Sequence, residues 1–279
     1  MSSDSQNSRD YQIELVDKVV RLLETLRDAP PGLTLQELAR RTGYVKSSIH
    51  RTLASLKRHG YVDQGRSGGP YSLGVRCLLL GRGLKEGIEL LRYARPCMQE
   101  IVDSFNESAY LAILRGGRGI FVEVVEARRR DLRLVGPLGA SVFYHATAAG
   151  KVFAAFQTVA ARTSLLDAID LRPLTPRTLV RRGDVEKEWA LVARRGLALN
   201  REESIVGAVF LAVPIFDAES SVCGAISVGV PKARYTPVIG RRIGERLTAG
   251  TSDLSSLLHA AGYVHEDCRI AELKPRPAE

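Results

Sequence analysis

Apolar residues recur every three or four positions in two segments near the start of the chain. The first segment runs from Tyr11 to Arg27 and the second from about Lys46 to His59. This spacing is typical of helices that bury one face and expose the other. The repeated apolar positions are Ile13, Val16, Val19, Val20, Leu23 and Leu26 in the first segment, and Val45, Ile49, Leu53 and Leu56 in the second.

A further helix is predicted between these two. Thr34 stands three residues before Glu37, the spacing of a capping box at the start of a helix. Gly43 ends the helix, because glycine readily takes the left-handed conformation of a tight turn. The chain then has two short extended segments that flank a glycine-rich tip. Together these elements predict a helix-turn-helix with a β-hairpin wing, spanning residues 10–75, with the extended segments at 61–64 and 71–73 and the tip at 65–70.

The rest of the chain predicts an α+β domain behind a linker. Residues 76–95 are expected to form one linker helix, and Pro96 is expected to open the next helix of a domain over 96–262. Residues 1–9 and 263–279 are expected to be tails without regular structure. The expected fold is therefore mixed α/β, with helices flanking a sheet of hairpins. Its predicted strands are Ser108–Leu114, Gly119–Glu126, Leu132–Val135, Leu197–Asn200, Val206–Phe216 and Val222–Val230, and its helices include Thr147–Gln157, Asp184–Arg195 and Pro237–Ala260.

Composition places the chain among globular proteins and leaves an anionic partner open. The 279 residues suffice for about two domains. They are 45% hydrophobic and 25% charged, with a net charge of +9. The polar N-terminal stretch has no apolar signal-peptide region, and the longest apolar run, 205–216, is too short to span a bilayer. Four scattered cysteines indicate free thiols and a reducing compartment. The chain is therefore expected to be cytoplasmic and to have no membrane partner.

The positive charge is concentrated on the predicted helix-turn-helix. Seven lysines and arginines and one acid, Asp63, lie from Arg40 to Arg66, a local net charge of +6. A helix that enters the DNA major groove reads base edges with its first turns, while flanking cations contact phosphates. A solvated basic helix of a protein–protein module is the alternative. The candidate base-reading residues are Lys46, Ser47, Ser48, His50 and Arg51, the candidate phosphate contacts are Arg40, Arg41, Lys57 and Arg58, and Arg66 on the wing is a candidate for the minor groove.

This segment resembles the N-terminal domain of IclR-type transcriptional regulators. The sequences KSSIHRTL at 46–53 and YSLG at 71–74 carry most of the resemblance. Ser48 replaces the usual threonine and keeps the hydroxyl. The resemblance implies a winged helix that binds an operator in double-stranded DNA.

The C-terminal half is similar, more loosely, to the GAF-like effector-binding domain of the same regulators. The similar segments are HATAAGK at 145–151, RRGLALNREESIVGAVFLAVPIFD at 194–217 and AISVGVPKAR at 225–234. The resemblance extends over roughly residues 10–262 and implies that these segments meet at a pocket for a small-molecule effector. The implied effector-binding residues are Phe143, Tyr144, Ala148, Ala149, Asn200, Phe210, Ser227 and Gly229.

Several of these positions depart from the family pattern. Asn200 stands in place of an acid, Phe210 in place of a cysteine, Gly229 in place of a serine, and Phe143-Tyr144 in place of Pro-Leu. Hydroxyl, thiol and carboxylate groups suit a short 2-oxo acid, whereas rings suit an apolar ligand. We therefore expect an aromatic or apolar organic acid as effector.

The sequence thus predicts a DNA-binding transcriptional regulator, repressor or activator, that responds to a small-molecule effector. It is expected to bind a pseudo-palindromic operator as a homodimer or homotetramer, because a two-fold site requires two copies. We expect no metal and no cofactor, since neither an H-E-x-x-H nor a P-loop motif is present. An enzyme fused to a DNA-binding domain is the first alternative, but no nucleophile with its base is recognisable, so an enzyme is not expected. The second is an effector-independent DNA-binding protein whose pocket is filled by Phe210.

Overall fold

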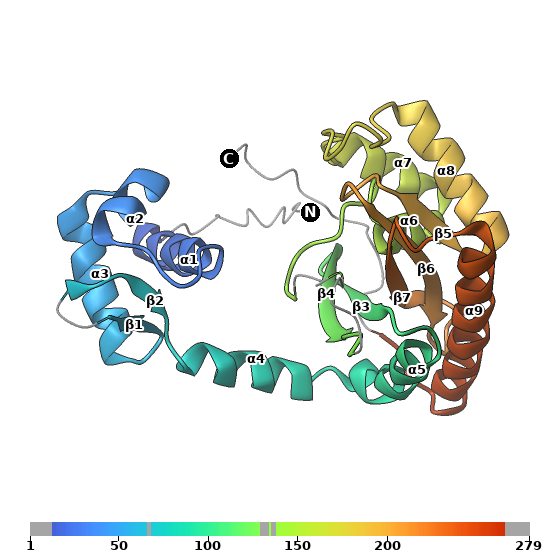
Figure 1. Cartoon of the computed structure of the whole chain (residues 1–279), viewed down its shortest axis with the longest axis horizontal. Coiled ribbons are helices and arrows are strands. Elements are labelled where there is room, and N and C mark those ends of the chain that lie inside the picture. The colour runs from blue at the N-terminus through green and yellow to red at the C-terminus, as the bar shows by residue number, and fades with distance from the viewer. Residues whose placement is uncertain (1–12, 66–67, 129–133, 135–137, 266–279) are drawn as a thin grey trace, which may run out of the picture. The chain divides into compact units, whose positions relative to one another are not determined.

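A computed structural model describes residues 13–65, 68–128, 134 and 138–265 of the chain (Figure 1). The chain divides after Gly87 into two compact units. Among the described residues, no helix is long and apolar enough to cross a membrane.

The first unit is a winged helix-turn-helix, as predicted. Thr34 and Glu37 form the expected capping box, and Gly43 has the left-handed backbone, with a φ of 74°. The core contains Leu22, Leu38 and Ile49. The elements are α1 (Glu14–Arg27), α2 (Leu35–Thr42), α3 (Lys46–Arg58), the wing strands β1 (Val62–Gln64) and β2 (Tyr71–Leu73), and α4 (Arg76–Glu86).

The predicted linker helix over 76–95 is wrong in its extent. The structure has two helices here, α4 and α5 (Glu89–Phe105), with a break at Gly87 and Ile88. Pro96 lies inside α5 and does not open a new helix. A proline inside a helix removes one backbone hydrogen bond. The buried stripe of α5 offsets that loss, because it packs on the sheet of the second unit along Leu90, Leu91, Ala94, Met98, Ile101 and Val102.

The second unit is built on a five-stranded antiparallel sheet with the strand order β4-β3-β7-β6-β5. Consecutive strands β3 and β4 form one hairpin and β6 and β7 another, as predicted. The strands are β3 (Ser108–Arg115), β4 (Arg118–Val125), β5 (Ala198–Arg201), β6 (Ala208–Phe216) and β7 (Val222–Pro231), and the other helices are α6 (Ala148–Ala155), α7 (Val159–Ala168), α8 (Arg182–Arg195) and α9 (Pro237–Ala260).

Helices cover both faces of this sheet (Figure 1). Leu111, Val228 and Leu211 on one face pack against α5 and α9. Ala112 and Ala212, each one residue further along its strand, and Ala225, the cross-strand partner of Ala112, face α6, α7 and α8. Because successive side chains in a strand point to opposite faces, both sets are buried. The small residues on the second face leave room there for the cavity described below.

Two details differ from the sequence prediction, and a third lies mostly outside the described residues. The strand expected over 132–135 lies outside the described residues except for Leu134, which is not in a strand. β6 begins at Ala208, not Val206, because 204–207 form a turn. Residues 263–265, predicted to belong to a tail, are packed on the second unit: the backbone N–H of His265 donates to Asp217, and its ring lies 2.6 Å from the Leu114 carbonyl oxygen.

Candidate functional site

Helix α3 presents a polar face and a buried face. Ile49, Thr52 and Leu53 point into the core of the first unit. Four of the five candidate base-reading residues (Lys46, Ser47, His50 and Arg51) are exposed, and so are all four candidate phosphate contacts (Arg40, Arg41, Lys57 and Arg58). Arg66 lies outside the described residues. The residues of α3 proposed to touch DNA thus share the solvent side of one helix.

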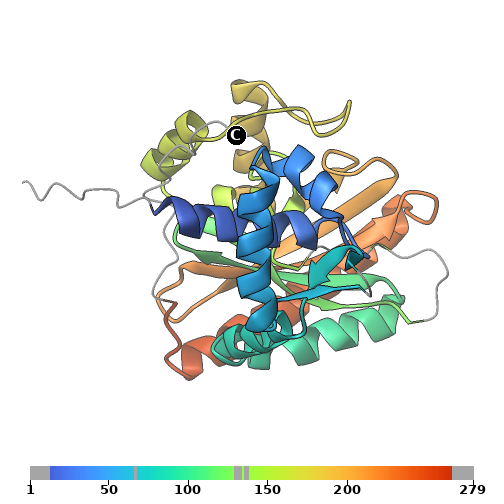
Figure 2. The same cartoon turned by 90° about the vertical axis from the view of Figure 1, so that its left-hand side faces the viewer.

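Ser48, the fifth base-reading candidate, is half-buried and already has a partner. The ammonium of Lys18 on α1 donates a hydrogen bond of 3.0 Å to its hydroxyl. Lys18 and Arg21 also lie over the ring of Tyr44, 5.3 Å and 6.0 Å from its centre. Figure 2 shows α1 (dark blue) running crosswise to α3 (mid-blue). The contact links residues thirty positions apart, so helical periodicity alone gave no signal for Lys18 as part of this surface.

The second unit contains a cavity of about 200 Å³ on the α6 side of the sheet. Six of the eight residues predicted to bind an effector line it: Phe143, Ala148, Ala149, Asn200, Phe210 and Ser227. The sequence reasoning missed most of the remaining wall, because most of its residues lie in loops far apart along the chain and Tyr110 lies on a strand that is buried on both faces. Those residues are Tyr110, Phe121, Leu134, Ala140, Ser141, Thr147, Leu174, Ser204 and Ile205.

Tyr144 and Gly229, the other two predicted residues, do not line the cavity. The Tyr144 hydroxyl donates to the Gly117 carbonyl oxygen at 2.8 Å and accepts from the Gly119 N–H at 3.1 Å, so it anchors the β3–β4 turn. Burial raises the pKa of Tyr144 to about 12, so the hydroxyl keeps its proton. Gly229 is covered by Phe210 and Leu134. Both predictions of direct lining are therefore wrong.

The cavity wall is mostly apolar, and four of its fifteen residues are aromatic: Tyr110, Phe121, Phe143 and Phe210. The ring centroids of Tyr110 and Phe121 are 6.4 Å apart, and those of Tyr110 and Phe210 are 6.1 Å apart. The Tyr110 hydroxyl donates to the Leu134 carbonyl oxygen at 2.6 Å, which holds Leu134 at the wall. Burial raises the pKa of Tyr110 to about 12, so this donor keeps its proton at neutral pH.

Polar groups meet the cavity at two places. Ala148 and Ala149 begin α6, and the first N–H groups of a helix have no acceptor within it. The Ser227 side chain is buried, lines the cavity and has no hydrogen-bond partner among the described residues. The cavity thus combines ring surfaces with a few donors, an arrangement suited to an apolar ligand with one polar end.

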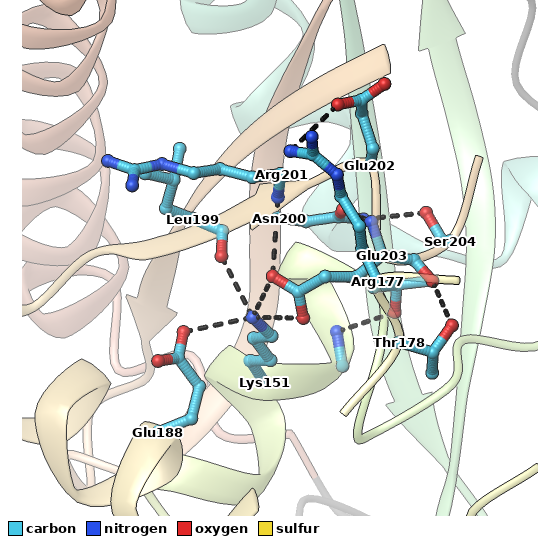
Figure 3. Close-up of polar contacts among 12 residues, drawn as sticks. Lys151, Arg177, Thr178, Glu188, Leu199, Asn200, Arg201, Glu202, Glu203 and Ser204 are labelled. Carbon is cyan, nitrogen blue, oxygen red and sulfur yellow. Dashed lines mark hydrogen bonds and ion pairs between the residues drawn. The ribbon is translucent and has the colours of Figure 1, made fainter. Parts of the chain in front are cut away.

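A buried lysine follows the cavity-lining residues Ala148 and Ala149 on α6, and its polar contacts are drawn in Figure 3. The Lys151 side chain, on α6, is fully buried. Its ammonium donates to Glu188 on α8 at 2.9 Å, to the Leu199 carbonyl oxygen on β5 at 2.9 Å, and to Glu203 at 2.8 Å. The cluster ties α6 and β5, which contribute residues to the cavity wall, to α8 and to the turn after β5.

The turn that follows β5 is held from several sides. Asn200 accepts a hydrogen bond from the Glu203 N–H at 2.8 Å and donates to the Ser204 hydroxyl at 2.6 Å (Figure 3). Thr178 donates to the Glu203 carbonyl oxygen at 2.7 Å, and Lys232 pairs with Glu202. Asn200 is therefore buried with both ends of its amide engaged, and it shapes the turn that brings Ser204 to the cavity.

Among the residues that the structure describes, no group of three metal-binding side chains lies close enough to hold an ion. His145, next to the cavity loop, is buried beside the Arg172 carbonyl oxygen at 3.1 Å, and burial lowers the pKa of its ring. Its position supports the loop that carries Leu174 to the cavity. Its hydrogen bond to a main-chain oxygen is structural in character.

Two family models match the chain, one for each unit. The model for the IclR helix-turn-helix domain matches residues 15–66, and the model for the bacterial transcriptional regulator IclR C-terminal domain matches residues 84–256.

Individual relatives match over most of their length. The chain is 32% identical to the glycerol operon regulatory protein of Streptomyces griseus, over 81% of this chain and 87% of that protein. It is 28% identical to the HTH-type transcriptional regulator XynR of Escherichia coli, over 80% and 88%. A solved structure of an IclR homologue from Microbacterium hydrocarbonoxydans, in complex with 4-hydroxybenzoate, superposes with a TM-score of 0.73 at 23% identity, covering 88% of this chain and 99% of that one.

Proposed function

The chain belongs to the IclR family of bacterial transcriptional regulators, and we propose that it binds a pseudo-palindromic operator as a homodimer or homotetramer under the control of an aromatic or apolar carboxylic acid. It is a DNA-binding regulator whose effector domain is the second unit. We therefore place its action in the cytoplasm, where the DNA is.

Operator reading is assigned to the exposed face of α3. Lys46, Ser47, His50 and Arg51 reach base edges, with Ser48 next to them. Arg40, Arg41, Lys57 and Arg58 contact phosphates on either side, because cations at the flanks set the register of a helix in the groove. Arg66 reaches the minor groove from the tip of the wing. The exposure of the described members of this set and the excess of positive charge support the assignment.

Assembly through a second copy is supported by α4. The helix buries none of its residues, and Leu78, Leu80 and Leu84 are 72%, 61% and 56% exposed. Leu80 and Leu84 lie one turn apart on the same side of the helix, and an exposed apolar strip of this kind indicates a surface that a partner covers. We assign this cover to the α4 helix of a second copy, since a two-fold operator also requires two DNA-reading units.

The proposed effector class rests on a single observation, the chemical character of the side chains that line the cavity. Tyr110, Phe121 and Phe210 form ring surfaces, and Ser227 and the start of α6 supply the polar end. A helix N-terminus favours a carboxylate. The 4-hydroxybenzoate bound by the Microbacterium homologue is an acid of this class. An aromatic acid fits this cavity better than pyruvate or glyoxylate, which would leave the ring surfaces without contacts.

Calorimetric titration of the full chain with benzoate and with pyruvate tests the effector class. We expect benzoate to bind more tightly than pyruvate and to change the affinity of the protein for its operator. Phe210→Cys enlarges the cavity and is expected to shift the preference toward pyruvate. Tight pyruvate binding by the wild type would refute the class, and no binding of any acid would favour the effector-independent alternative. Turnover of an acid would favour the alternative of an enzyme fused to a DNA-binding domain.

A further inference from the structure

Phe210 and Tyr110 meet across an intervening strand. Phe210 lies on β6 and Tyr110 on β3, and β7 runs between them. Neighbouring strands are about 4.8 Å apart, so the two backbones are separated by roughly 9.5 Å. The ring centroids are nevertheless only 6.1 Å apart. The Phe210 side chain therefore leans over β7 toward Tyr110.

Gly229 on β7 makes this crossing possible. It is the cross-strand partner of Phe210 and has Ser108 of β3 on its other side. A Cβ at position 229 would lie 2.7 Å from Phe210 Cε1 and 3.0 Å from Leu134 Cδ1. Carbon atoms in contact are ordinarily about 3.5–4.0 Å apart. A side chain of any kind at 229 therefore conflicts with the present position of the Phe210 ring.

If the Phe210 ring is displaced, it can move in only one direction. On the other side of β6, Asn200 is buried, pairs with Phe210 across the strands and is held by hydrogen bonds to Glu203 and Ser204. On the β7 side the new Cβ blocks the ring. The open space is the cavity, which Phe210 already lines. Moving the ring into the cavity would reduce the cavity volume and break the contact between Phe210 and Tyr110.

We infer that Gly229 is a specificity-determining residue that acts through Phe210. By lacking a side chain, it lets Phe210 lie across β7 and form a ring floor, defined as Tyr110, Phe121 and Phe210, that selects a planar acid over a non-planar acid of the same size. This inference rests on the proposed effector class. Ser227 supports the geometry, because it lies two residues before Gly229 on β7, is the cross-strand partner of Tyr110 and lines the cavity.

The physical basis of the selection is ring geometry. Aromatic rings prefer offset or edge-to-face contacts with one another, and such contacts are worth more than the area that they bury. A cyclohexane ring is thicker and has no π-face, so it makes neither contact. Benzoate and cyclohexanecarboxylate carry the same charge and the same number of carbons. The difference between their affinities therefore isolates the contribution of the ring floor.

The experiment compares four full-length proteins: wild type, Gly229→Ala, Phe210→Val and the double variant. Each is titrated with benzoate and cyclohexanecarboxylate, and each is unfolded thermally. Gly183→Ala is the matched control, because a Cβ at 183 meets nothing within 4 Å. We expect wild type to prefer benzoate by about tenfold, and Gly229→Ala to lose about tenfold in benzoate affinity.

We also expect Gly229→Ala to lower the unfolding midpoint and the double variant to recover it, since a shorter residue at 210 removes the conflict. The double variant should bind benzoate and cyclohexanecarboxylate equally, because its ring floor is incomplete. Unchanged benzoate affinity in Gly229→Ala, or strictly additive effects on the unfolding midpoint, would overturn the inference.

The same experiment distinguishes a failure of the proposed effector class from a failure of the inference about Gly229. If wild type binds neither ring acid, the specificity role of Gly229 falls together with the effector class, whereas non-additive midpoints would still establish the packing of Phe210 over Gly229. If wild type binds benzoate and Gly229→Ala binds it equally well, the effector class stands and the inference about Gly229 fails.

Discussion

The Lys151 ammonium lies 2.7 Å from a carboxylate oxygen of Glu203, and both residues are buried (Figure 3). Burial raises the pKa of Glu203, and the charge of Lys151 acts in the opposite direction. The pair joins α6, which borders the cavity, to the turn that carries Ser204 and Ile205. The cavity walls on these two sides are therefore fixed to each other.

Replacing Lys151 with methionine should destabilise the protein by about 3–5 kcal/mol at neutral pH, because it leaves a buried carboxylate without its counter-charge. Removing the lysine raises the pKa of Glu203 further. A carboxyl group whose pKa is higher in the folded than in the unfolded state costs stability progressively as the pH rises from the unfolded pKa to the folded pKa. The variant should therefore lose more stability at pH 8 than at pH 5, as measured by urea unfolding at both values.

Arg182→Met is the control for this substitution. Arg182 also pairs with two acids, Asp167 and Glu186, but all three side chains are largely exposed. Exposed ion pairs contribute little to stability. A small, pH-independent change is expected for Arg182→Met. Equal losses in the two variants would contradict the role assigned to burial.

Arg51→Ala should weaken binding to the operator more than binding to random DNA. The expected difference is about 1–3 kcal/mol if the Arg51 guanidinium contacts a guanine. Lys57→Ala should weaken both by similar amounts, because a phosphate contact carries no sequence information. Fluorescence anisotropy at a fixed salt concentration measures both. Equal losses on the two DNAs for every base-reading candidate would refute the assignment of α3.

Lys18→Met and Ser48→Ala should have non-additive effects on operator affinity. Lys18 holds the Ser48 hydroxyl at 3.0 Å, so removing either partner disrupts the same contact. Coupled neighbours typically show interaction energies of about 0.5–3 kcal/mol. A double-mutant cycle with the operator measures this energy. Lys18→Met combined with Lys57→Ala is the control pair and should be additive, and additivity in both cycles would remove Lys18 from the reading surface.

Leu80→Asp together with Leu84→Asp should convert the assembled protein to a monomer and weaken operator binding. Both leucines are exposed on α4, one helical turn apart, where a charged group would be buried against the second copy. Sedimentation velocity at micromolar concentration measures the assembly state. Val159→Asp replaces an equally exposed residue on α7 and should leave assembly unchanged. A monomeric wild type would contradict the proposed role of α4.

The sequence by itself determined the elements whose signals are local. The capping box of Thr34 and Glu37, the left-handed Gly43 and the full extent of α9 all follow from residues a few positions apart. Hydrogen bonds and steric limits within one turn decide such features, so neighbouring residues suffice to predict them. The succession of winged helix and α+β domain could be predicted for the same reason.

Only the tertiary structure decided how distant segments meet. Helix α5 continues through Pro96 while its buried stripe packs on the sheet, and the chain breaks instead at Gly87. Tyr110 lines the cavity, although its strand is buried on both faces and shows no alternation of apolar and polar residues that would mark the cavity side. Gly229 affects the cavity through Phe210 and not by lining it. These outcomes depend on contacts across strands and between helices, and such contacts are set by the fold as a whole because the residues involved are far apart along the chain.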